Sequence, residues 1–166
     1  TSPTNYDILK SEAKLILNNE NYNFTTGFQS YEDLNLSNSD RYQFILPYYD
    51  FNKQIFENNF TGTINFGSSG SNDLNNTNNL KTKIVNDLNY QSLDFISKNG
   101  FKSSYNFYFK NLNTIAKNDS IYKTSPQMEL MSLFEFNTSL PLINQTKNST
   151  NYFTPKASIR FNPGDM

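Results

Sequence analysis

The chain of 166 residues contains no cysteine and no histidine. Without cysteine it can form no disulfide, no thiolate nucleophile and no cysteine metal site. Without histidine it lacks the side chain that most often acts as a general base or a metal ligand near neutral pH. Only a carboxylate pair or an all-oxygen cation site remains, and either would need residues far apart in the sequence. We therefore expect a protein that is not an enzyme and needs no cofactor.

An excess of charge of one sign is also lacking. The chain has 14 basic and 15 acidic residues and a net charge of -1. This balance gives no electrostatic field that would attract a polyanion. We expect no nucleic-acid partner.

Long apolar runs are absent as well, because no segment approaches the ~20 residues that a membrane-spanning helix requires. The first residues, "TSPTNYDILK", have neither the basic start nor the apolar middle of a secretory signal, so any signal has been removed or lies upstream. The length suits one domain, and no shift in composition marks a boundary, so residues 1–166 are expected to form a single domain.

What the sequence does contain is alternation, shown best by "QMELMSLFEFNTSL" from Gln127 to Leu140. Successive side chains of a strand point to opposite faces, so alternation of this kind predicts a strand between two different environments. One row is apolar and holds Met128, Leu130, Ser132, Phe134, Phe136, Thr138 and Leu140. The other row is mostly polar and holds Gln127, Glu129, Met131, Leu133, Glu135, Asn137 and Ser139.

Seven segments share this pattern, and clusters of turn-forming residues separate them. They are Tyr22 to Ser30, Tyr42 to Tyr48 (with Tyr42, Phe44, Leu46 and Tyr48 on one row), Phe60 to Ser68, Leu80 to Ser92, Phe101 to Asn111, Gln127 to Leu140 and Phe153 to Asn162. An eighth segment, Ile8 to Leu17, suits either a strand or a short helix and is counted as a strand. Pro47 is expected to terminate its strand, "GSSGSND" to form a turn, and the asparagine-rich run "SNDLNNTNNL" to fill a loop.

Alternation alone does not tell whether the apolar rows face a protein core or lipid. Several segments reach the ~9 to 11 residues of a membrane strand, whereas soluble strands commonly have ~5 to 6. The apolar rows are rich in Phe and Tyr and are interrupted by Ser, Thr, Asn and Gly, which a close-packed core tolerates poorly. These features favour lipid. The expected fold is all-β: an antiparallel up-and-down transmembrane β-barrel segment of about eight strands, part of a larger barrel.

The two rows then have separate roles. The residues expected to face a water-filled lumen are Lys81, Lys83, Asp87, Lys102, Lys110, Glu129, Glu135, Lys156 and Arg160. The residues expected to face lipid are Phe101, Tyr105, Phe107, Phe109, Met128, Leu130, Phe134, Phe136, Leu140, Ile159 and Phe161. An ordinary solvated face of a soluble sheet is the alternative explanation of the charged rows.

A family resemblance is carried by four runs. They are "SDRYQFILPYYDFNK" (Ser39 to Lys53), "GTINFGSSGSNDLNNTNNLKTKIVNDLNYQS" (Gly62 to Ser92), "SPQMELMSLFEFNTSLPL" (Ser125 to Leu142) and "FTPKASIRFNPGDM" (Phe153 to Met166). In order and spacing they resemble the barrel of the LptD family, the lipopolysaccharide-assembly proteins of the Gram-negative outer membrane, in its alphaproteobacterial branch. The chain departs from the family in having room for about eight strands only and in lacking a last strand with a terminal aromatic residue, so it resembles an internal piece.

The resemblance implies a very large barrel in the cell outer membrane that releases lipopolysaccharide into the outer leaflet. It also implies a lipoprotein plug in the lumen and periplasmic bridge proteins that act through a separate N-terminal domain. No gate or groove residue is carried over. Two other functions stay open: a soluble or secreted all-β carbohydrate-binding module, and a complete small eight-stranded outer-membrane barrel.

Overall fold

The structure is a computed structural model that describes residues 7–56, 62–76 and 78–164. Strands make up 74% of it, and no α-helix is present among these residues. Accordingly, the described part of the chain offers no helix that is long and apolar enough to cross a membrane. The prediction of an all-β fold is confirmed.

The long strands follow the segments of alternating sequence, because alternation lets a strand present different side chains to its two sides. The strands are β1 (Ile8–Asn18), β2 (Tyr22–Asp33), β3 (Tyr42–Phe56), β4 (Gly62–Asn75), β5 (Asn79–Ser92), β6 (Phe95–Ile96), β7 (Lys102–Lys117), β8 (Gln127–Ser139), β9 (Leu142–Gln145), β10 (Thr150–Phe153) and β11 (Lys156–Phe161). The strand β11 follows such a segment as well, whereas the short strands β6, β9 and β10 lie outside those segments, apart from Phe153 at the end of β10. One 3₁₀ turn, η1 (Asn38–Arg41), precedes β3.

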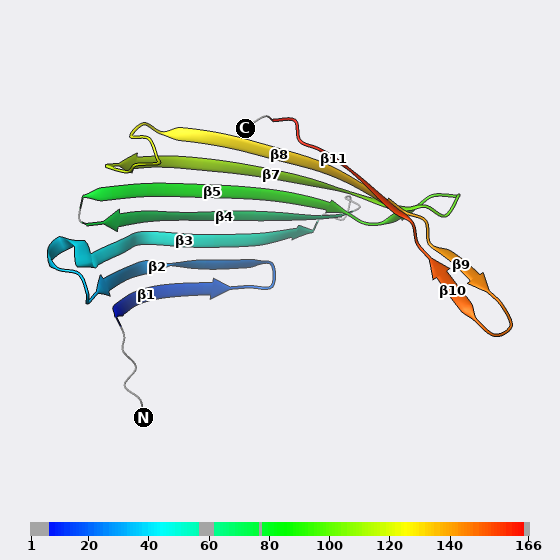
Figure 1. Cartoon of the computed structure of the whole chain (residues 1–166), viewed down its shortest axis with the longest axis horizontal. Coiled ribbons are helices and arrows are strands. Elements are labelled where there is room, and N and C mark those ends of the chain that lie inside the picture. The colour runs from blue at the N-terminus through cyan, green and yellow to red at the C-terminus, as the bar shows by residue number, and fades with distance from the viewer. Residues whose placement is uncertain (1–6, 57–61, 77, 165–166) are drawn as a thin grey trace, which may run out of the picture. The chain divides into compact units, whose positions relative to one another are not determined.

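The main sheet is antiparallel and up-and-down, with the order β1-β2-β3-β4-β5-β7-β8-β11 (Figure 1). The short strand β6 pairs with β7, and β9 and β10 form a separate two-stranded sheet. The main sheet does not close, so β1 and β11 are its edge strands. The predicted meander of about eight strands is therefore present, as an open sheet.

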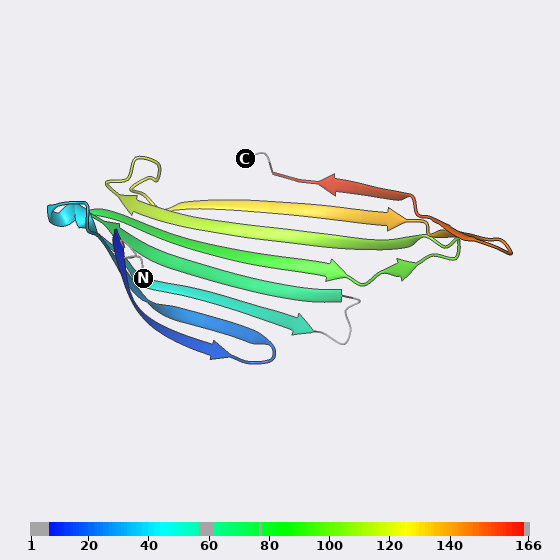
Figure 2. The same ribbon diagram turned by 60° about the horizontal axis from the view of Figure 1, so that its bottom comes forward.

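The chain forms two compact units that share the long strands. Unit 1 is made of the described residues of Thr1–Lys53, Phe66–Asp87 and Asn111–Glu129. Unit 2 is made of those of Gln54–Asn65, Leu88–Lys110 and Leu130–Met166. Within unit 2, the β9–β10 hairpin extends beyond the ends of β8 and β11 (Figures 1 and 2).

Several strands run past the ends that the sequence predicted for them. Pro47 does not terminate β3, which runs on to Phe56. Its place in a strand is explained by a register shift, because between Gly27 and Gln29 of β2 the partner changes from Tyr48 to Ile45. A proline without an N–H is tolerated at such an irregularity. The residue range 112–117, expected in a linker, belongs to β7.

The glycine- and asparagine-rich region also differs from the prediction. The run "GSSGSND", expected as a turn, lies within β4, which ends only at Asn75. Only glycine fits at position 70 of this strand, because any side chain would collide with the ring of Tyr49. An added Cβ would lie 2.5 Å from Cε1 of that ring. Most of "SNDLNNTNNL" is likewise in β4 and β5, so the asparagines are mainly strand residues. Composition predicted a loop here, and side-chain contacts between strands overrode it.

The described residues contain almost no hydrophobic core. Ala116, 4% exposed, is the one buried hydrophobic side chain among them. The other buried side chains are polar, namely Ser92, Ser103, Asn106 and Thr114. Large apolar side chains such as Met128, Ile159 and Phe161 are more than half exposed, at 67%, 68% and 61%. No described residues therefore cover the apolar rows of the sheet.

Candidate functional site on the two faces of the sheet

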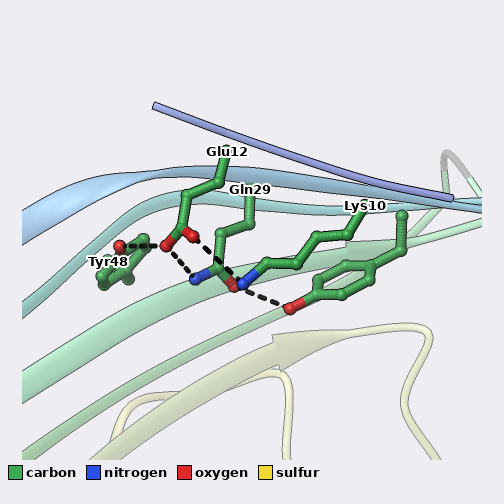
Figure 3. A network of polar contacts seen from close by, with 5 residues as sticks. Lys10, Glu12, Gln29 and Tyr48 are labelled. Carbon is green, nitrogen blue, oxygen red and sulfur yellow. Dashed lines mark hydrogen bonds and ion pairs between the residues drawn. The ribbon is translucent and has the colours of Figure 1, made fainter. Parts of the chain in front are cut away.

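In unit 1 the polar rows of β1, β2 and β3 meet around one carboxylate (Figure 3). Glu12 Oε1 accepts hydrogen bonds from the Tyr48 hydroxyl at 2.7 Å and from Gln29 Nε2 at 2.9 Å. Its Oε2 is 3.1 Å from Lys10 Nζ. Tyr31 donates to Gln29 Oε1 at 2.9 Å and thereby fixes the orientation of the amide. The carboxylate is thus held by one donor or cation from each of three strands.

The sequence did not predict this cluster, because it placed Tyr48 on the apolar row with Tyr42, Phe44 and Leu46. That placement is wrong. The register shift adds a residue to β3 before Tyr48, and one extra residue moves every later side chain to the opposite face. Tyr48 therefore pairs with Gly27 on the polar row and reaches Glu12.

A second cluster lies on the polar rows of unit 2, around Glu135. Glu135 pairs in register with Arg160 of β11, and Arg160 Nε lies 2.5 Å from Glu135 Oε2. The other oxygen, Oε1, accepts from Asn137 Nδ2 at 2.7 Å and from Asn106 Nδ2 at 3.4 Å. This cluster ties the edge strand β11 to β8 and β7 by side chains as well as by backbone pairing.

Charge reversal at Glu135 tests this cluster. We expect Glu135→Arg to lower the urea midpoint of the folded chain, because it places two cations opposite each other in register. The double variant Glu135→Arg/Arg160→Glu should recover more than half of the loss. Glu129→Arg, the same change six residues away on the same row, is the control and should lower the midpoint less. No recovery in the double variant would contradict the pairing.

All nine residues expected to face the lumen lie on the polar rows of their strands. They are Lys81, Lys83 and Asp87 on β5, Lys102 and Lys110 on β7, Glu129 and Glu135 on β8, and Lys156 and Arg160 on β11. Ion pairs also involve these residues, because Lys81 Nζ lies 3.8 Å from Asp73 and Lys102 Nζ lies 2.8 Å from Asp94. Whether these rows face a lumen stays a prediction.

The residues expected to face lipid fall on the other rows, with two differences. Phe101 and Leu140 lie just outside β7 and β8 and so belong to connections. The rest are in strands: Tyr105, Phe107 and Phe109 on β7, Met128, Leu130, Phe134 and Phe136 on β8, and Ile159 and Phe161 on β11. Phe136 pairs with Ile159 and Phe134 with Phe161, so the apolar rows of β8 and β11 share a face within unit 2.

On the apolar rows of unit 1 the side chains change from aromatic to polar within one step along the strands. The aromatic row consists of Phe24, Phe51 and Phe66, whose ring centroids are 6.4 Å and 6.2 Å apart in turn. The next row consists of hydrogen-bonded polar side chains, which we call the amide ladder: Tyr49, Ser68, Asn86, Asn111 and Asn113.

The amide ladder crosses β3, β4, β5 and β7. The hydroxyls of Tyr49 and Ser68 are 3.2 Å apart, and Ser68 donates to Asn86 Oδ1 at 2.8 Å. Asn86 Nδ2 then donates to Asn111 Oδ1 at 3.1 Å, and Asn113 donates to the same oxygen. The alternation of the sequence already places Asn86 on the row of Ile84 and Leu88, and Asn111 on the row of Phe109. Only the strand register shows that the two asparagines meet.

Within unit 1, polar contacts hold the connection between β7 and β8 to residues of β5 and of the turn before it. Asn118 Nδ2 donates to the backbone oxygen of Asn78 at 3.0 Å, and Lys81 Nζ lies 5.5 Å from the centre of the Tyr122 ring. The Asp119 carboxylate accepts from the backbone N–H groups of Tyr122 and Ile121, both at 2.8 Å. These donors lower the pKa of Asp119 below its ordinary value, because they stabilise its charged form.

The carboxylates of the described chain are dispersed over the strands and their connections. No group of three or more Asp or Glu residues among the described positions could hold a metal ion. Comparison with known proteins adds no assignment, because no family model and no curated protein matches the chain. The candidate site is therefore the pair of faces, one polar and the other apolar.

Proposed function

We propose that this chain is part of the wall of an outer-membrane β-barrel that assembles lipopolysaccharide in the outer leaflet. The observation that carries the proposal is the main sheet, whose apolar rows are uncovered. A soluble domain buries such a face against a second layer of helices or strands. Here Ala116 is the one buried hydrophobic side chain of the described residues, so something other than those residues must cover the apolar rows. Lipid does so for a membrane barrel.

Strand length supports the same proposal. The long strands have 11 residues in β1, 12 in β2, 15 in β3, 14 in each of β4 and β5, 16 in β7 and 13 in β8. A tilted membrane strand needs ~9 to 11 residues. Every one of these strands is long enough, whereas strands of a soluble sandwich commonly have ~5 to 6 residues.

The open edges support a larger barrel over a small one. A complete eight-stranded barrel would pair β1 with β11, and the sheet does not close between them. In hydrocarbon, the unpaired N–H and C=O groups of an edge cost several kcal/mol each, so both edges need partners. We propose that neighbouring strands of the same barrel supply them.

The transport part of the proposal rests on the resemblance to the LptD family. In that case the polar rows line the lumen, where clusters such as Glu12 with Lys10 and Glu135 with Arg160 would contact saccharide or the lipoprotein plug. Such contacts suit a mixed-charge wall, because sugars and their phosphates bind both amide and ionic groups. The periplasmic bridge proteins would act outside this chain.

Crosslinking tests both parts together. A photoreactive residue would be placed at Ser104 of a polar row or at Phe107 of an apolar row, in the outer membrane of the protein's own host. We expect adducts with lipopolysaccharide or the plug from position 104 and with lipid from position 107. If lipid adducts form at 107 and no lipopolysaccharide adduct forms at 104, the chain is supported as part of a barrel wall and the transport proposal is contradicted.

A soluble carbohydrate-binding module is the second candidate, favoured by the half-buried amides of the amide ladder beside aromatic rings. It predicts a monodisperse protein in buffer without detergent. Size-exclusion chromatography with light scattering distinguishes it from the barrel wall, which should aggregate without detergent or lipid because its apolar rows are exposed.

A further inference from the structure

We infer that the amide ladder marks the level at which the apolar rows leave the hydrocarbon of the membrane and enter the lipid headgroup layer. The inference rests on the proposed barrel wall and adds its depth in the bilayer. The ladder separates each of the four strands that it crosses, β3, β4, β5 and β7, into a lipid-facing part and a part that contacts headgroups and water.

The first argument is the order of side chains along the strands. Phe66 is followed on its row by Ser68, Phe51 lies next to Tyr49, and Phe109 is followed by Asn111. Apolar, aromatic and polar layers succeed one another in this order at the edge of a bilayer, where Tyr and Trp rings form a belt at the interface. A Phe lies directly beside a ladder residue on β3, β4 and β7 alike, so the step from aromatic to polar side chains is a property of the sheet.

The second argument is the cost of polar groups in hydrocarbon. Side-chain amides have two donors and an oxygen with two lone pairs, and the ladder bonds use only part of this capacity. Asn86 makes two of these hydrogen bonds, one as acceptor from Ser68 and one as donor to Asn111. The rest must be met by other partners, and headgroups and water provide them where acyl chains cannot.

The third argument is the length of the strands. Eight residues of β7, Lys102 to Phe109, lie on the apolar side of the ladder, and Phe101 just before the strand makes nine. This length is close to the ~9 to 11 residues that cross a bilayer. The remaining residues of β7, up to Lys117, are then surplus. Another polar contact follows the ladder toward the same strand ends, because Thr82 Oγ1 donates to Asn72 Oδ1 at 2.7 Å.

Two matched positions on β7 test the inference. Phe107 and Ile115 lie on the same row, are 37% and 39% exposed, and flank the ladder residues of β7. They are eight residues apart, which is ~26 Å along a strand and ~19 Å in depth at a tilt of ~45°. The chain has no cysteine, so Phe107→Cys and Ile115→Cys each accept one fluorophore without background labelling.

Each labelled chain would be refolded into phosphatidylcholine vesicles that carry bromine deep in the acyl chains. We expect the label at 107 to be quenched at least threefold more by the brominated lipid than by iodide in the water. At 115 the preference should reverse. Equal quenching of both labels by deep bromine would overturn the inference while leaving the barrel wall intact. No quenching at 107 by brominated lipid would overturn the barrel wall itself.

A second pair of labelled positions, on β5, controls for a label that disturbs β7. Leu88 and Ile84 flank Asn86 on the same row of β5. A label at Leu88→Cys should behave like the one at 107, and a label at Ile84→Cys like the one at 115. If the β5 pair shows the same quenching at both positions, the ladder is no boundary on that strand.

Discussion

Phe107→Arg is expected to prevent assembly of the chain into membranes. Phe107 lies on the apolar row of β7, a strand with β5 on one side and β8 on the other. A cationic side chain that faces lipid near the bilayer midplane costs ~2 to 4 kcal/mol. That cost lowers the ratio of inserted to uninserted protein roughly 30- to 1,000-fold, because each ~1.4 kcal/mol is a factor of ten. The inserted fraction would be measured by flotation of vesicles after refolding.

The neighbouring residue provides a matched control. Tyr108 is 40% exposed, against 37% for Phe107, and lies on the polar row of the same strand. Tyr108→Arg should insert nearly as well as the unmodified chain, because its cation would face water. Equal insertion of both variants would show that neither face contacts hydrocarbon. Insertion of Phe107→Arg with failure of Tyr108→Arg would reverse the two faces.

Phe134→Arg repeats the test on another strand. Phe134 pairs with Phe161, and its ring lies 6.5 Å from the ring of Tyr105. In a soluble sheet both Arg variants would stay folded in buffer, since the side chain could extend into water. Circular dichroism without lipid therefore separates loss of insertion from loss of folding.

The sequence predicted the strands well because a strand's alternation is a local property. Period two is visible in any eight residues, and it put Glu129 and Glu135 on one row and Phe134 on the other without knowledge of neighbours. The ends of β4 and β7 were less predictable. Gly67 and Gly70 read as turn residues, but Gly70 lies in a strand under the ring of Tyr49, a contact that depends on pairing across the sheet.

Register was the information that the sequence did not contain. The shift opposite Gly27 moved Tyr48 to the polar row, and no local signal apart from Pro47 marks it. The amide ladder has the same origin, because Asn86 and Asn111 are 25 residues apart. Their positions on apolar rows were readable, but their hydrogen bond follows only from how β5 pairs with β7.

Gly27→Ala is expected to detach the edge strand β1. Gly27 is buried between Lys14 of β1 and Tyr48 of β3. A Cβ at this position would lie 2.4 Å from the backbone oxygen of Ala13 and 3.1 Å from the Cα of Lys14. The backbone of β1 would have to move away, and this strand has a neighbour on one side only. Overpacking of this kind costs ~1 to 3 kcal/mol.

Gly67→Ala is the matched control, because Gly67 is also a strand glycine on a polar row. The nearest atom to an added Cβ there is Asn52 Oδ1 at 3.1 Å, the end of a side chain that can rotate away. Gly67→Ala should lower the free energy of unfolding only slightly, since alanine also reduces the conformational freedom of the unfolded chain. Urea unfolding of the refolded chain would compare the two variants, and hydrogen exchange would follow the amides of β1.

Fast exchange confined to β1 in Gly27→Ala would locate the effect at the edge strand. The Glu12 cluster should be lost with it, because Lys10 and Glu12 are on β1 while Gln29 and Tyr48 remain on β2 and β3. Equal midpoints and equal exchange for both glycine variants would mean that β1 does not lie as close to β2 as the register requires. In a larger barrel, a neighbouring strand paired with β1 should reduce the loss, so the variant also reports whether this edge is covered.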